Sequence, residues 1–515
     1  MGLLWCSVIF LWTIVGAEVS TSGYKLAVVC EKEGHLVEVL DRYVTISLNN
    51  ESHVDETVQS FLIHVREERS NAKNIAEWIG HPINAYHLVK RTAKDWLKVQ
   101  QKINCNTCLP TIAAQEFYSS WNQIIDRQGI WTSSNDIMIA EKGLARLYET
   151  YAIDYKTLIS GTILNVSTTP LTPADAISIA LHLEKEPKIT WIEKLLETEE
   201  ISDKESLLYD LAMAYHMVKK SQKALDILKN LQQTSTRPMK GIIRIVRQAA
   251  KKSVDTEPYE SPFFHQEKLA KAYRNLCQEN SQEVKSAPVL HCYNKVTQIP
   301  YYTAKEEVIN YVPRVSRFHD VISDQEISQL MNASKYQLKP ASVVGKDGKY
   351  TSVFKTRTGE TAWIHPSEEI AIRLDRRVTL LTGLDSFSAE YFEVVNYGLG
   401  GHYLWHYDAL DLLNKKNIDR DYELGDRIAT WMFYLSDVQA GGATVFPRLS
   451  LRIPPIKGTA VFWYNLLPSG ERDDRSQHGS CPVLLGSKWI TTKWILEHRQ
   501  EFRKPCRINP MDEHL

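Results

Sequence analysis

Residues 396–408 read Asn396-Tyr397-Gly398-Leu399-Gly400-Gly401-His402-Tyr403-Leu404-Trp405-His406-Tyr407-Asp408. A glycine-rich turn leads here into a run that ends on His406 and Asp408. Successive side chains of a strand point to opposite faces, so these two residues share a face. Two histidines and one carboxylate on one face of Fe(II) leave coordination positions open for other ligands. The stretch therefore predicts two of the three protein ligands of a non-haem iron site.

The third ligand is expected from a later strand that closes over the first. His478 is the best candidate, because it follows the apolar run 459–465. Two other histidines compete for this role. His402 precedes His406 on the same strand and is expected beside the ligands rather than among them. His498 lies in a charged run and is expected in solvent.

Lys488 follows His478 at the start of a run that alternates between two faces. Lys488, Ile490, Thr492 and Trp494 share one face, and Lys493 falls on the other. Only one of the two lysines can therefore point into the interior. A buried lysine needs a charge partner, and the distal carboxylate of 2-oxoglutarate would supply one. We expect Lys488 to bind 2-oxoglutarate and Lys493 to be solvated.

Glycine divides the chain into two parts. Residues 1–320 hold nine glycines, and the remaining 195 residues hold fourteen. Helices avoid glycine, whereas turns between strands use it. The predicted class is α+β and multidomain, with a helical front and a β-rich back. The predicted strands are Glu390–Asn396, Arg427–Leu435, Thr444–Phe446, Thr459–Asn465 and Lys488–Leu496. Such strands between glycine turns predict a jelly roll, or double-stranded β-helix, over residues 306–515.

The front is expected to contain two helical units. Val54, Val58, Leu62 and Val65 recur at helical spacing within an N-terminal domain over 18–150. Their apolar face fits either an ordinary core or a dimerisation surface. In residues 165–240, Trp191, Ile192 and Leu195 recur 33 positions later as Ala224, Leu225 and Leu228. This offset is close to the tetratricopeptide (TPR) period and predicts a TPR-like unit that holds an extended peptide, with a plain helical hairpin as the alternative. Residues 241–305 are interpreted as a linker that contains a disulfide.

Composition and the N-terminal segment indicate a secreted route. Lys and Arg number 61 against 62 Asp and Glu, which gives no electrostatic case for nucleic acid as a partner. Residues 1–17 are predicted to be a cleaved signal peptide, and no later stretch is long and apolar enough for a membrane span. Three glycosylation sequons begin at Asn50, Asn165 and Asn332.

Seven cysteines remain after the signal peptide, an odd number for an oxidising compartment. Cys277 with Cys292, and Cys481 with Cys506, are plausible local disulfides. Cys105 and Cys108 form a lone CxxC. A small-loop disulfide or two free thiols fits this pair better than a zinc site does. The pairing of Cys30, Cys105 and Cys108 stays open.

The sequence resembles the α subunits of animal collagen-type prolyl 4-hydroxylases, in the 2-oxoglutarate/Fe(II) dioxygenase family. The stretches that carry the resemblance are 397–401, 406–408, 427–431, 441–447, 458–465 and 478–489, with 80–85 in the front. The resemblance implies that His406, Asp408 and His478 bind iron, that Lys488 binds 2-oxoglutarate, and that Tyr397 lies near this co-substrate. It implies 4-hydroxylation of proline in collagen-like or other Pro-rich peptides, with O2 as co-substrate and succinate and CO2 as products.

The same resemblance implies a cellular setting. It indicates ascorbate as reductant and an α2β2 tetramer with protein disulfide isomerase as the β subunit. The expected compartment is the lumen of the endoplasmic reticulum. The C-terminal Asp512-Glu513-His514-Leu515 is not a KDEL-type signal, so retention through such a partner would make sense. Cys277–Cys292 and Cys481–Cys506 match the intrachain disulfides of the family.

Two departures from the family concern the peptide. The strand entering the iron site reads His402-Tyr403-Leu404-Trp405, where polar residues or proline are more usual. In the TPR-like unit, Asp210, Met213 and His216 replace expected groove tyrosines. This predicts a shifted peptide preference, unless Tyr209 and Tyr215 supply the aromatic platform. Two alternative functions stay open: a lysyl-type hydroxylase, and a catalytically weak chaperone subunit that binds Pro-rich peptides.

Overall fold

The computed structural model describes residues 19–507 except 50–52, 71, 104–110, 127–129, 199–200, 202, 236–237, 253–263, 279–290, 298, 300, 345–349, 352–355 and 411–423. The predicted signal peptide, the Asn50 sequon and the Cys105–Cys108 pair lie outside these residues. None of the helices within them is long and apolar enough to cross a membrane.

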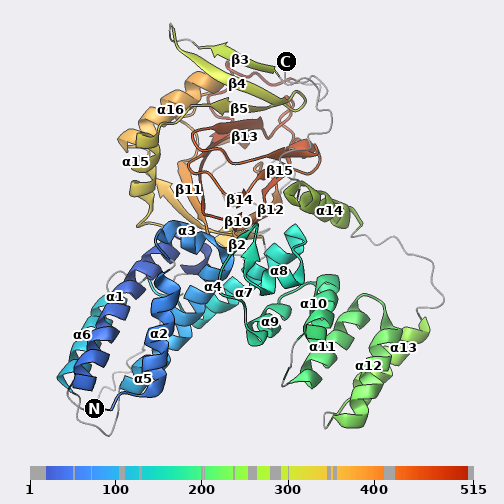
Figure 1. Ribbon diagram of the computed structural model, residues 1–515. Helices are drawn as coiled ribbons and strands as arrows, with labels where there is room; N and C mark the ends of the chain where they lie inside the picture. The colour runs from blue at the N-terminus through green and yellow to red at the C-terminus, as the bar shows by residue number, and fades with distance from the viewer. Residues whose placement is uncertain are drawn as a thin grey trace, which may run out of the picture.

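Helices α1 to α8 form the N-terminal part (Figure 1). They are α1 (Gly23–Asn49), α2 (Glu56–Ser70), α3 (Ile75–Gly80), α4 (Pro82–Lys90), a π-helical turn (Arg91–Asp95), α5 (Trp96–Ile103), α6 (Ile112–Asp126), α7 (Ser134–Tyr151) and α8 (Tyr155–Ile159), followed by the β1–β2 hairpin (Thr162–Ile163, Val166–Ser167). Val58, Leu62 and Val65 of α2 are buried in one core with residues of α1, α5 and α6. The apolar face of α2 therefore packs in the core of this chain.

Five further helices continue the front. They are α9 (Pro173–Ala180), α10 (Lys185–Thr198), α11 (Lys204–Met217), α12 (Ser221–Thr234) and α13 (Lys240–Lys252). Each packs on the next along the chain. The repeated residues Trp191, Ile192, Leu195, Ala224, Leu225 and Leu228 are all buried. The helical front of the chain is confirmed.

Two antiparallel sheets build the C-terminal part. The nine-stranded sheet runs in the order β3 (His291–Val296), β4 (Thr303–Asn310), β5 (Val315–His319), β17 (Ala460–Tyr464), β13 (Arg427–Tyr434), β20 (Lys488–Leu496), β11 (Phe392–Tyr397), β10 (Glu360–Ile364) and β6 (Lys339–Pro340). The five-stranded sheet runs in the order β16 (Leu451–Ile453), β15 (Thr444–Phe446), β18 (His478–Ser480), β12 (His402–His406) and β9 (Arg357–Thr358). Short two-stranded pairings join β14 (Ala440–Gly441) to β19 (Val483–Leu485) and β7 (Val343–Val344) to β8 (Tyr350–Thr351). The β-rich back of the chain is therefore confirmed.

The nine-stranded sheet is covered on both faces. Val395 and Met432 share one core with Phe446 and Ile453 of the other sheet, so the inner faces pack together. Helices α15 (Asp324–Ser334) and α16 (Glu369–Thr382) cover the outer face, as Figure 1 shows. Strands with both faces covered are buried throughout, and every residue of β13 and β20 is buried.

The two predicted disulfides, Cys277–Cys292 in the 241–305 linker and Cys481–Cys506, were both wrong. Helix α14 (Phe264–Gln278) packs on α7, β15 and β16, which brings Cys277 against Cys481. These two residues form a disulfide across 204 positions, whereas Cys292 and Cys506 are free and exposed. Proximity in sequence did not decide the pairing, because the fold returns α14 to the sheet. Strand β3 within this segment also joins the nine-stranded sheet.

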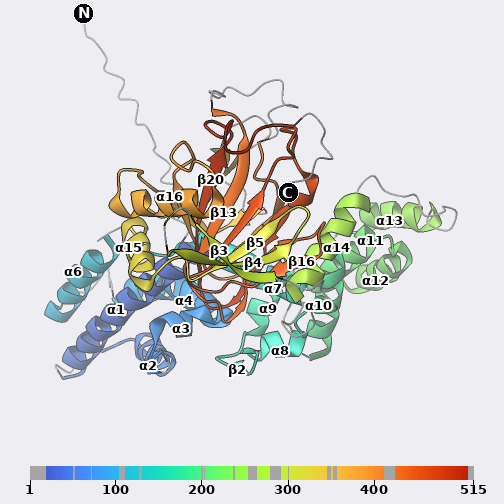
Figure 2. The same ribbon diagram turned by 90° about the horizontal axis from the view of Figure 1, so that it is seen from above.

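The helical front docks on the loops of the β-rich part (Figure 2). The amide of Gly398 donates to the carbonyl of Thr21 at 2.9 Å. The guanidinium of Arg146 donates to the carbonyl of Gly400 at 2.7 Å. Gly400 leaves no room for a Cβ, because that atom would lie 2.8 Å from the carbonyl oxygen of Gly143 on α7. The glycine-rich turn before His406 therefore serves as a contact surface between the two parts.

Candidate active site

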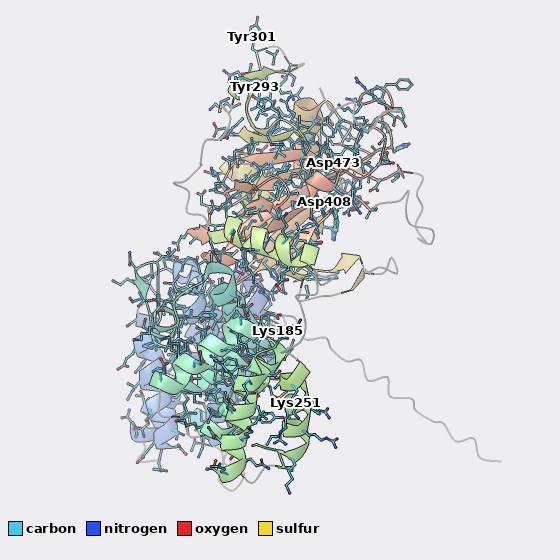
Figure 3. All side chains as sticks on the ribbon, turned by 90° about the vertical axis from the view of Figure 1, so that its right-hand side faces the viewer. Lys185, Lys251, Tyr293, Tyr301, Asp408 and Asp473 are labelled. Atoms are coloured by element: carbon cyan, nitrogen blue, oxygen red, sulfur yellow. A yellow bond between two sulfur atoms is a disulfide. The ribbon has the colours of Figure 1, made fainter. Side chains whose placement is uncertain are left out.

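Three side chains of the predicted iron site converge between the two sheets. Strands β12 and β18 pair antiparallel, and His406 lies directly opposite His478. Asp408 lies just beyond the end of β12. The Nε2 atoms of His406 and His478 each lie 3.6 Å from a carboxylate oxygen of Asp408. In the described part of the chain, these three residues are the one group of at least three such side chains whose ligand atoms could hold a metal ion. Figure 3 labels Asp408 among these strands.

Hydrogen bonds on the far side of each ring fix the two histidines. Nδ1 of His406 lies 2.7 Å from the carbonyl of Leu404, and Nδ1 of His478 lies 2.9 Å from the carbonyl of Ser476. A carbonyl can only accept, so each Nδ1 carries the proton. Each Nε2 then keeps its lone pair for the centre, which is the arrangement of metal-binding histidines.

The carboxylate of Asp408 is held by a chain of buried hydrogen bonds. The hydroxyl of Thr430 donates to Asp408 Oδ2 at 2.7 Å, and the amide of Asn465 donates to the Thr430 hydroxyl at 2.9 Å. Burial opposes the charge of Asp408, but His478, His406 and Arg427 together hold its pKa far below the usual range. Burial also lowers the pKa of His478 to about 4. At neutral pH the site therefore offers an ionised carboxylate and a neutral imidazole, the forms that bind metals.

Lys488 is completely buried beside this group. It lies across from Tyr397 in the pairing of β20 with β11, and its ammonium lies over the Tyr397 and Tyr434 rings at 5.6 and 5.7 Å. Its Nζ donates to the hydroxyl of Ser480 at 2.8 Å. Within the described residues no carboxylate pairs with it, and burial lowers its pKa to about 7. The interior thus holds a cation that lacks its charge partner.

The expectation that Lys493 is solvated was wrong. Strand alternation does place it on the face opposite Lys488, but α16 covers that face. Lys493 is 1% exposed, and its Nζ lies 2.8 Å from Oδ1 of Asp375 on α16. The periodicity of a strand separates two faces, but it cannot tell whether a helix covers one of them.

A small cavity of about 40 Å³ lies between the sheets. His406, Asp408, His478 and Lys488 line it. Among its other lining residues, Tyr403, Arg357, Glu393 and Ser480 were not predicted as site residues. The Tyr403 ring stacks on His406 with centroids 3.5 Å apart, and Arg357 lies over Tyr403 and pairs with Glu393 at 2.8 Å. Ser480 could have been found, since it lies two residues after His478 on the same strand. No local pattern marked Arg357.

The sequence of this chain also matches known protein families and individual relatives. Residues 22–165 match the family described as "Prolyl 4-Hydroxylase alpha-subunit, N-terminal region", and residues 392–496 match the "2OG-Fe(II) oxygenase superfamily". The chain is 34% identical to prolyl 4-hydroxylase subunit alpha-1 of Homo sapiens over 472 residues, which cover 84% of this chain and 86% of that protein. It is 32% identical to the Gallus gallus subunit alpha-1 over 522 residues, covering 91% and 98%.

The chain belongs to the prolyl 4-hydroxylase alpha-subunit family. Among solved structures, a viral collagen prolyl hydroxylase from Paramecium Bursaria Chlorella virus-1 in complex with 2OG matches at 27% identity. That match has a TM-score of 0.29 and covers 35% of this chain and 95% of the viral chain. The oxygenase match spans β11 to β20, the segment that holds all the site residues predicted from the sequence.

The remaining predicted residues of this prolyl 4-hydroxylase family member lie outside the cavity. His402 is buried but does not line it, and His498 is exposed as expected. Asp210, Met213 and His216 are half-buried on α11. Tyr215 is 6% exposed, and its hydroxyl bonds to Glu193. A ring buried to that degree offers little surface for a peptide, so the alternative that Tyr215 forms an aromatic platform loses support.

Proposed function

We propose that this chain is the catalytic α subunit of a procollagen-proline 4-dioxygenase. It hydroxylates peptidyl proline at C4 with O2 and 2-oxoglutarate, and it releases succinate and CO2. Family membership supports the reaction class. The observation that carries the proposal is a three-ligand cluster, His406, Asp408 and His478, next to a buried lysine without a carboxylate partner.

His406, Asp408 and His478 would hold Fe(II). Their donor set fits this ion, because two imidazole nitrogens and one carboxylate oxygen face a common centre. When bound, the iron supplies the oxygen-activating chemistry of the 2-oxoglutarate-dependent family. The protein's own part is to keep both Nε2 atoms deprotonated and to hold Asp408 ionised through Thr430.

Lys488 would bind the distal carboxylate of 2-oxoglutarate. Its ammonium already donates to Ser480, and a carboxylate between the two would take the place of that contact. Tyr397 forms the wall next to this ammonium. A carboxylate partner would satisfy the buried cation and raise its pKa again, since an opposite charge favours the charged form.

The site would also position the substrate and exclude water. Tyr403 packs flat on His406 and limits the directions from which a proline ring can approach. Buried side chains of both sheets line the cavity, including Trp463 of the nine-stranded sheet and Thr444 of the five-stranded one. Holding reactants in one geometry can supply a large part of the rate enhancement of an enzyme.

The proposed domains follow the roles of the elements. Residues 306–515 would form a jelly-roll dioxygenase domain, and residues 165–240 a TPR-like domain that binds collagen-like or other Pro-rich peptides. Asp210, Met213 and His216 on α11 would shift its peptide preference away from uncharged poly-proline. Residues 18–150 would form the N-terminal domain with a role in dimerisation, and residues 1–17 a signal peptide.

The cellular setting is inferred from family membership. Ascorbate would serve as reductant, and protein disulfide isomerase would form the β subunits of an α2β2 tetramer in the endoplasmic reticulum lumen. Co-expression with a disulfide isomerase should then yield a soluble hetero-oligomer, whereas the chain alone should be poorly soluble. A stable, active monomer on size-exclusion chromatography would contradict this assembly.

Mass spectrometry of Pro-rich peptides would test the reaction. The purified protein is incubated with Fe(II), 2-oxoglutarate, ascorbate and collagen-like peptides. We expect proline to gain one oxygen atom at C4, with one succinate released per hydroxylation. Oxidation of lysine instead of proline would indicate the lysyl-type alternative. Peptide binding without 2-oxoglutarate turnover would indicate the chaperone alternative.

A further inference from the structure

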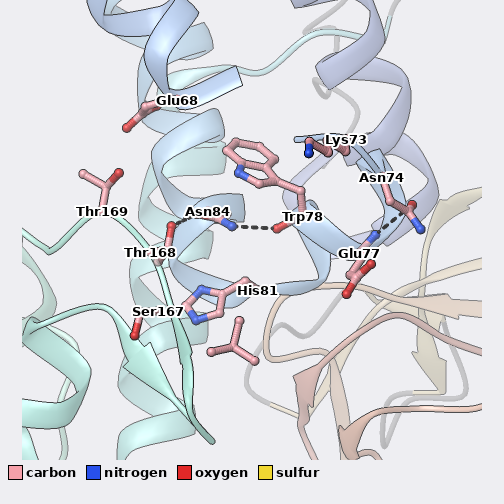
Figure 4. Close-up of a pocket in the computed structure, with 11 residues that line it drawn as sticks. Glu68, Lys73, Asn74, Glu77, Trp78, His81, Asn84, Ser167, Thr168 and Thr169 are labelled. Atoms are coloured by element: carbon pink, nitrogen blue, oxygen red, sulfur yellow. Dashed lines mark hydrogen bonds between the residues drawn. The ribbon is translucent and has the colours of Figure 1, made fainter. Parts of the chain in front are cut away.

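A second cavity lies far from the candidate iron ligands, in the helical front. It has a volume of about 570 Å³, within the range of ligand-binding pockets. Helices α2, α3 and α4 form one side, and the strand β2 with residues 168–169 forms the other (Figure 4). Its lining residues are Glu68, Lys73, Asn74, Glu77, Trp78, His81, Asn84, Val166, Ser167, Thr168 and Thr169.

The walls of this cavity are held in place without a ligand. The side-chain amide of Asn84 donates to the carbonyl of Trp78 at 2.9 Å. The hydroxyl of Thr168, on the opposite wall, donates to the carbonyl oxygen of the Asn84 side chain. Figure 4 shows both bonds: the bond from Thr168 joins the two walls, and the bond from Asn84 to Trp78 joins α4 to α3 within one wall. A preformed cavity of this kind loses little conformational entropy when it binds.

His81 is the unexplained residue of the cavity. It is 3% exposed, and neither of its ring nitrogens has a hydrogen-bond partner of normal geometry in the described structure. Burial lowers its pKa to about 4, although the nearby backbone of Val166 acts in the opposite direction. The ring is therefore neutral, with one N–H donor and one acceptor. A buried polar group without a partner costs free energy, so a ligand group that pairs with it would bind well.

The other lining groups restrict the chemistry of that ligand. Trp78 offers a half-buried ring with an indole N–H donor. Glu68 adds no free charge, because it pairs with the buried Arg91. Lys73 and Glu77 at the rim carry opposite charges. The cavity thus offers an apolar ring and neutral donors, without a net charge.

We propose that this cavity binds a proline-rich segment of an extended polypeptide. A proline ring presents a flat apolar face for Trp78, and polyproline carries carbonyl acceptors but no backbone N–H donors. These acceptors match the N–H groups of His81 and Trp78. The choice of ligand rests on the proposed function, whose substrate is a proline-containing chain. The site itself is separate from the candidate iron site and from α11.

The cavity also touches the catalytic part. Gly80, the residue before His81, accepts a hydrogen bond at 2.9 Å from the amide of Gly486, two residues before Lys488. A substrate strand held here would therefore be anchored on the same rigid contact that supports the loop leading into β20.

Calorimetry on the full-length protein, with its partner if one is required for solubility, would test the site. The probe is a short oligoproline peptide, measured without iron or 2-oxoglutarate. Val166→Arg is the key variant, because Val166 is 49% exposed on the wall, and a long side chain there fills the cavity without disturbing the core. Leu164→Arg is the matched control, since Leu164 is 61% exposed on the same hairpin and does not line the cavity.

We expect Val166→Arg and Trp78→Ala to weaken the peptide at least about tenfold, because a buried tryptophan contact in an interface commonly contributes that much. Leu164→Arg should bind as the wild type does. Hydrogen exchange should show new protection in residues 75–82 and 164–169 when the peptide binds. Unchanged affinity in Val166→Arg, or an equal loss in Leu164→Arg, would overturn the proposal.

Three further outcomes test the choice of ligand and separate this site from the proposed function. An oligosaccharide that displaces the peptide from residues 75–82 would overturn the choice of ligand, since sugars also stack on tryptophan. Normal peptide binding in this cavity, without any turnover of 2-oxoglutarate, would refute the proposed function and support this site. Turnover with no peptide-dependent protection at residues 75–82 would do the reverse.

Discussion

Strand β20 carries one buried lysine on each face, and the two differ in whether a carboxylate pairs with them. On the outer face, Lys493 pairs with Asp375 of α16 at 2.8 Å. On the inner face, Lys488 is equally buried, and its ammonium lies over two tyrosine rings and donates to the Ser480 hydroxyl, with no carboxylate partner among the described residues. A charge that serves the fold is paired by the fold itself. A buried charge without an opposite charge beside it, such as that of Lys488, is typical of a site that binds a charged ligand.

The pKa values of the two lysines reflect the same difference. Burial lowers the pKa of both. For Lys493 the carboxylate of Asp375 acts against burial, whereas for Lys488 burial is the only cause. Burial in turn raises the pKa of Asp375. Burial of the Lys493–Asp375 pair costs free energy, but each charge has its partner. Among the described residues, Lys488 has no carboxylate partner.

The largest loss of turnover is expected from a substitution in the cavity that the inner face of β20 lines. Asp408→Ala should reduce turnover by more than the roughly 100-fold that the loss of a residue supporting a metal ligand costs. Thr430→Val, which removes the hydrogen bond to Asp408 and the one that Thr430 accepts from Asn465, should reduce turnover by about 10- to 100-fold. Bound iron and turnover would be measured together, with thermal unfolding as a control. If Asp408→Ala keeps near wild-type turnover with normal iron content, its assignment as a ligand is wrong.

Lys488→Ala should raise the apparent KM for 2-oxoglutarate. Removing one partner of a buried charge pair costs at least about 2 kcal/mol, which corresponds to roughly 30-fold in affinity. Steady-state kinetics against 2-oxoglutarate at saturating peptide would measure this. Lys493→Ala is the matched control on the same strand. Equal KM changes in the two variants would remove the distinction between the faces.

Lys493→Ala should act on stability instead. It leaves Asp375 as an unpaired buried charge, which costs about 3–5 kcal/mol. Chemical denaturation would show a lower midpoint, while the fraction that stays folded should keep its KM for 2-oxoglutarate. A loss below about 1 kcal/mol would mean that the outer pair is more hydrated than its 2% and 5% side-chain exposures indicate.

The pH dependence of 2-oxoglutarate binding should follow Lys488. Only the ammonium form attracts a carboxylate, and burial lowers the pKa of Lys488 to about 7 when no 2-oxoglutarate is bound. Affinity should therefore be constant below that pH and fall about tenfold per unit above it. Lys488→Arg should bind more weakly, because its planar group needs more room, but without this pH dependence, because arginine stays charged. A flat profile between pH 7 and 9 in the wild type would contradict this.

The smallest effect is expected when both outer charges are removed together. The double variant Lys493→Met with Asp375→Leu leaves no unpaired charge, and apolar side chains of similar size fill the space. Replacing a buried ion pair in this way is often neutral or stabilising. Denaturation of the double variant should therefore lie close to the wild type, and turnover should be retained. A loss as large as that of Lys493→Ala would show that the outer pair has a specific role.

Local patterns in the sequence were sufficient for five of the strands and for placing His406 and Asp408 on one face. The predicted runs at 390–396, 427–435, 444–446, 459–465 and 488–496 correspond to β11, β13, β15, β17 and β20. Alternation and glycine turns depend only on neighbouring residues, so a sequence can display them. The same alternation separated Lys488 from Lys493, and the HxD spacing placed His406 and Asp408 at one centre.

The tertiary structure alone decided which residues meet across the fold. It paired Cys277 with Cys481 rather than with Cys292, because α14 returns to the sheet. It buried Lys493 under α16, and it brought Arg357 over Tyr403 beside the histidines. It also opened a cavity between α3 and β2 around His81. Each of these contacts joins segments that are distant in sequence, and their encounter depends on how whole elements pack rather than on any local pattern.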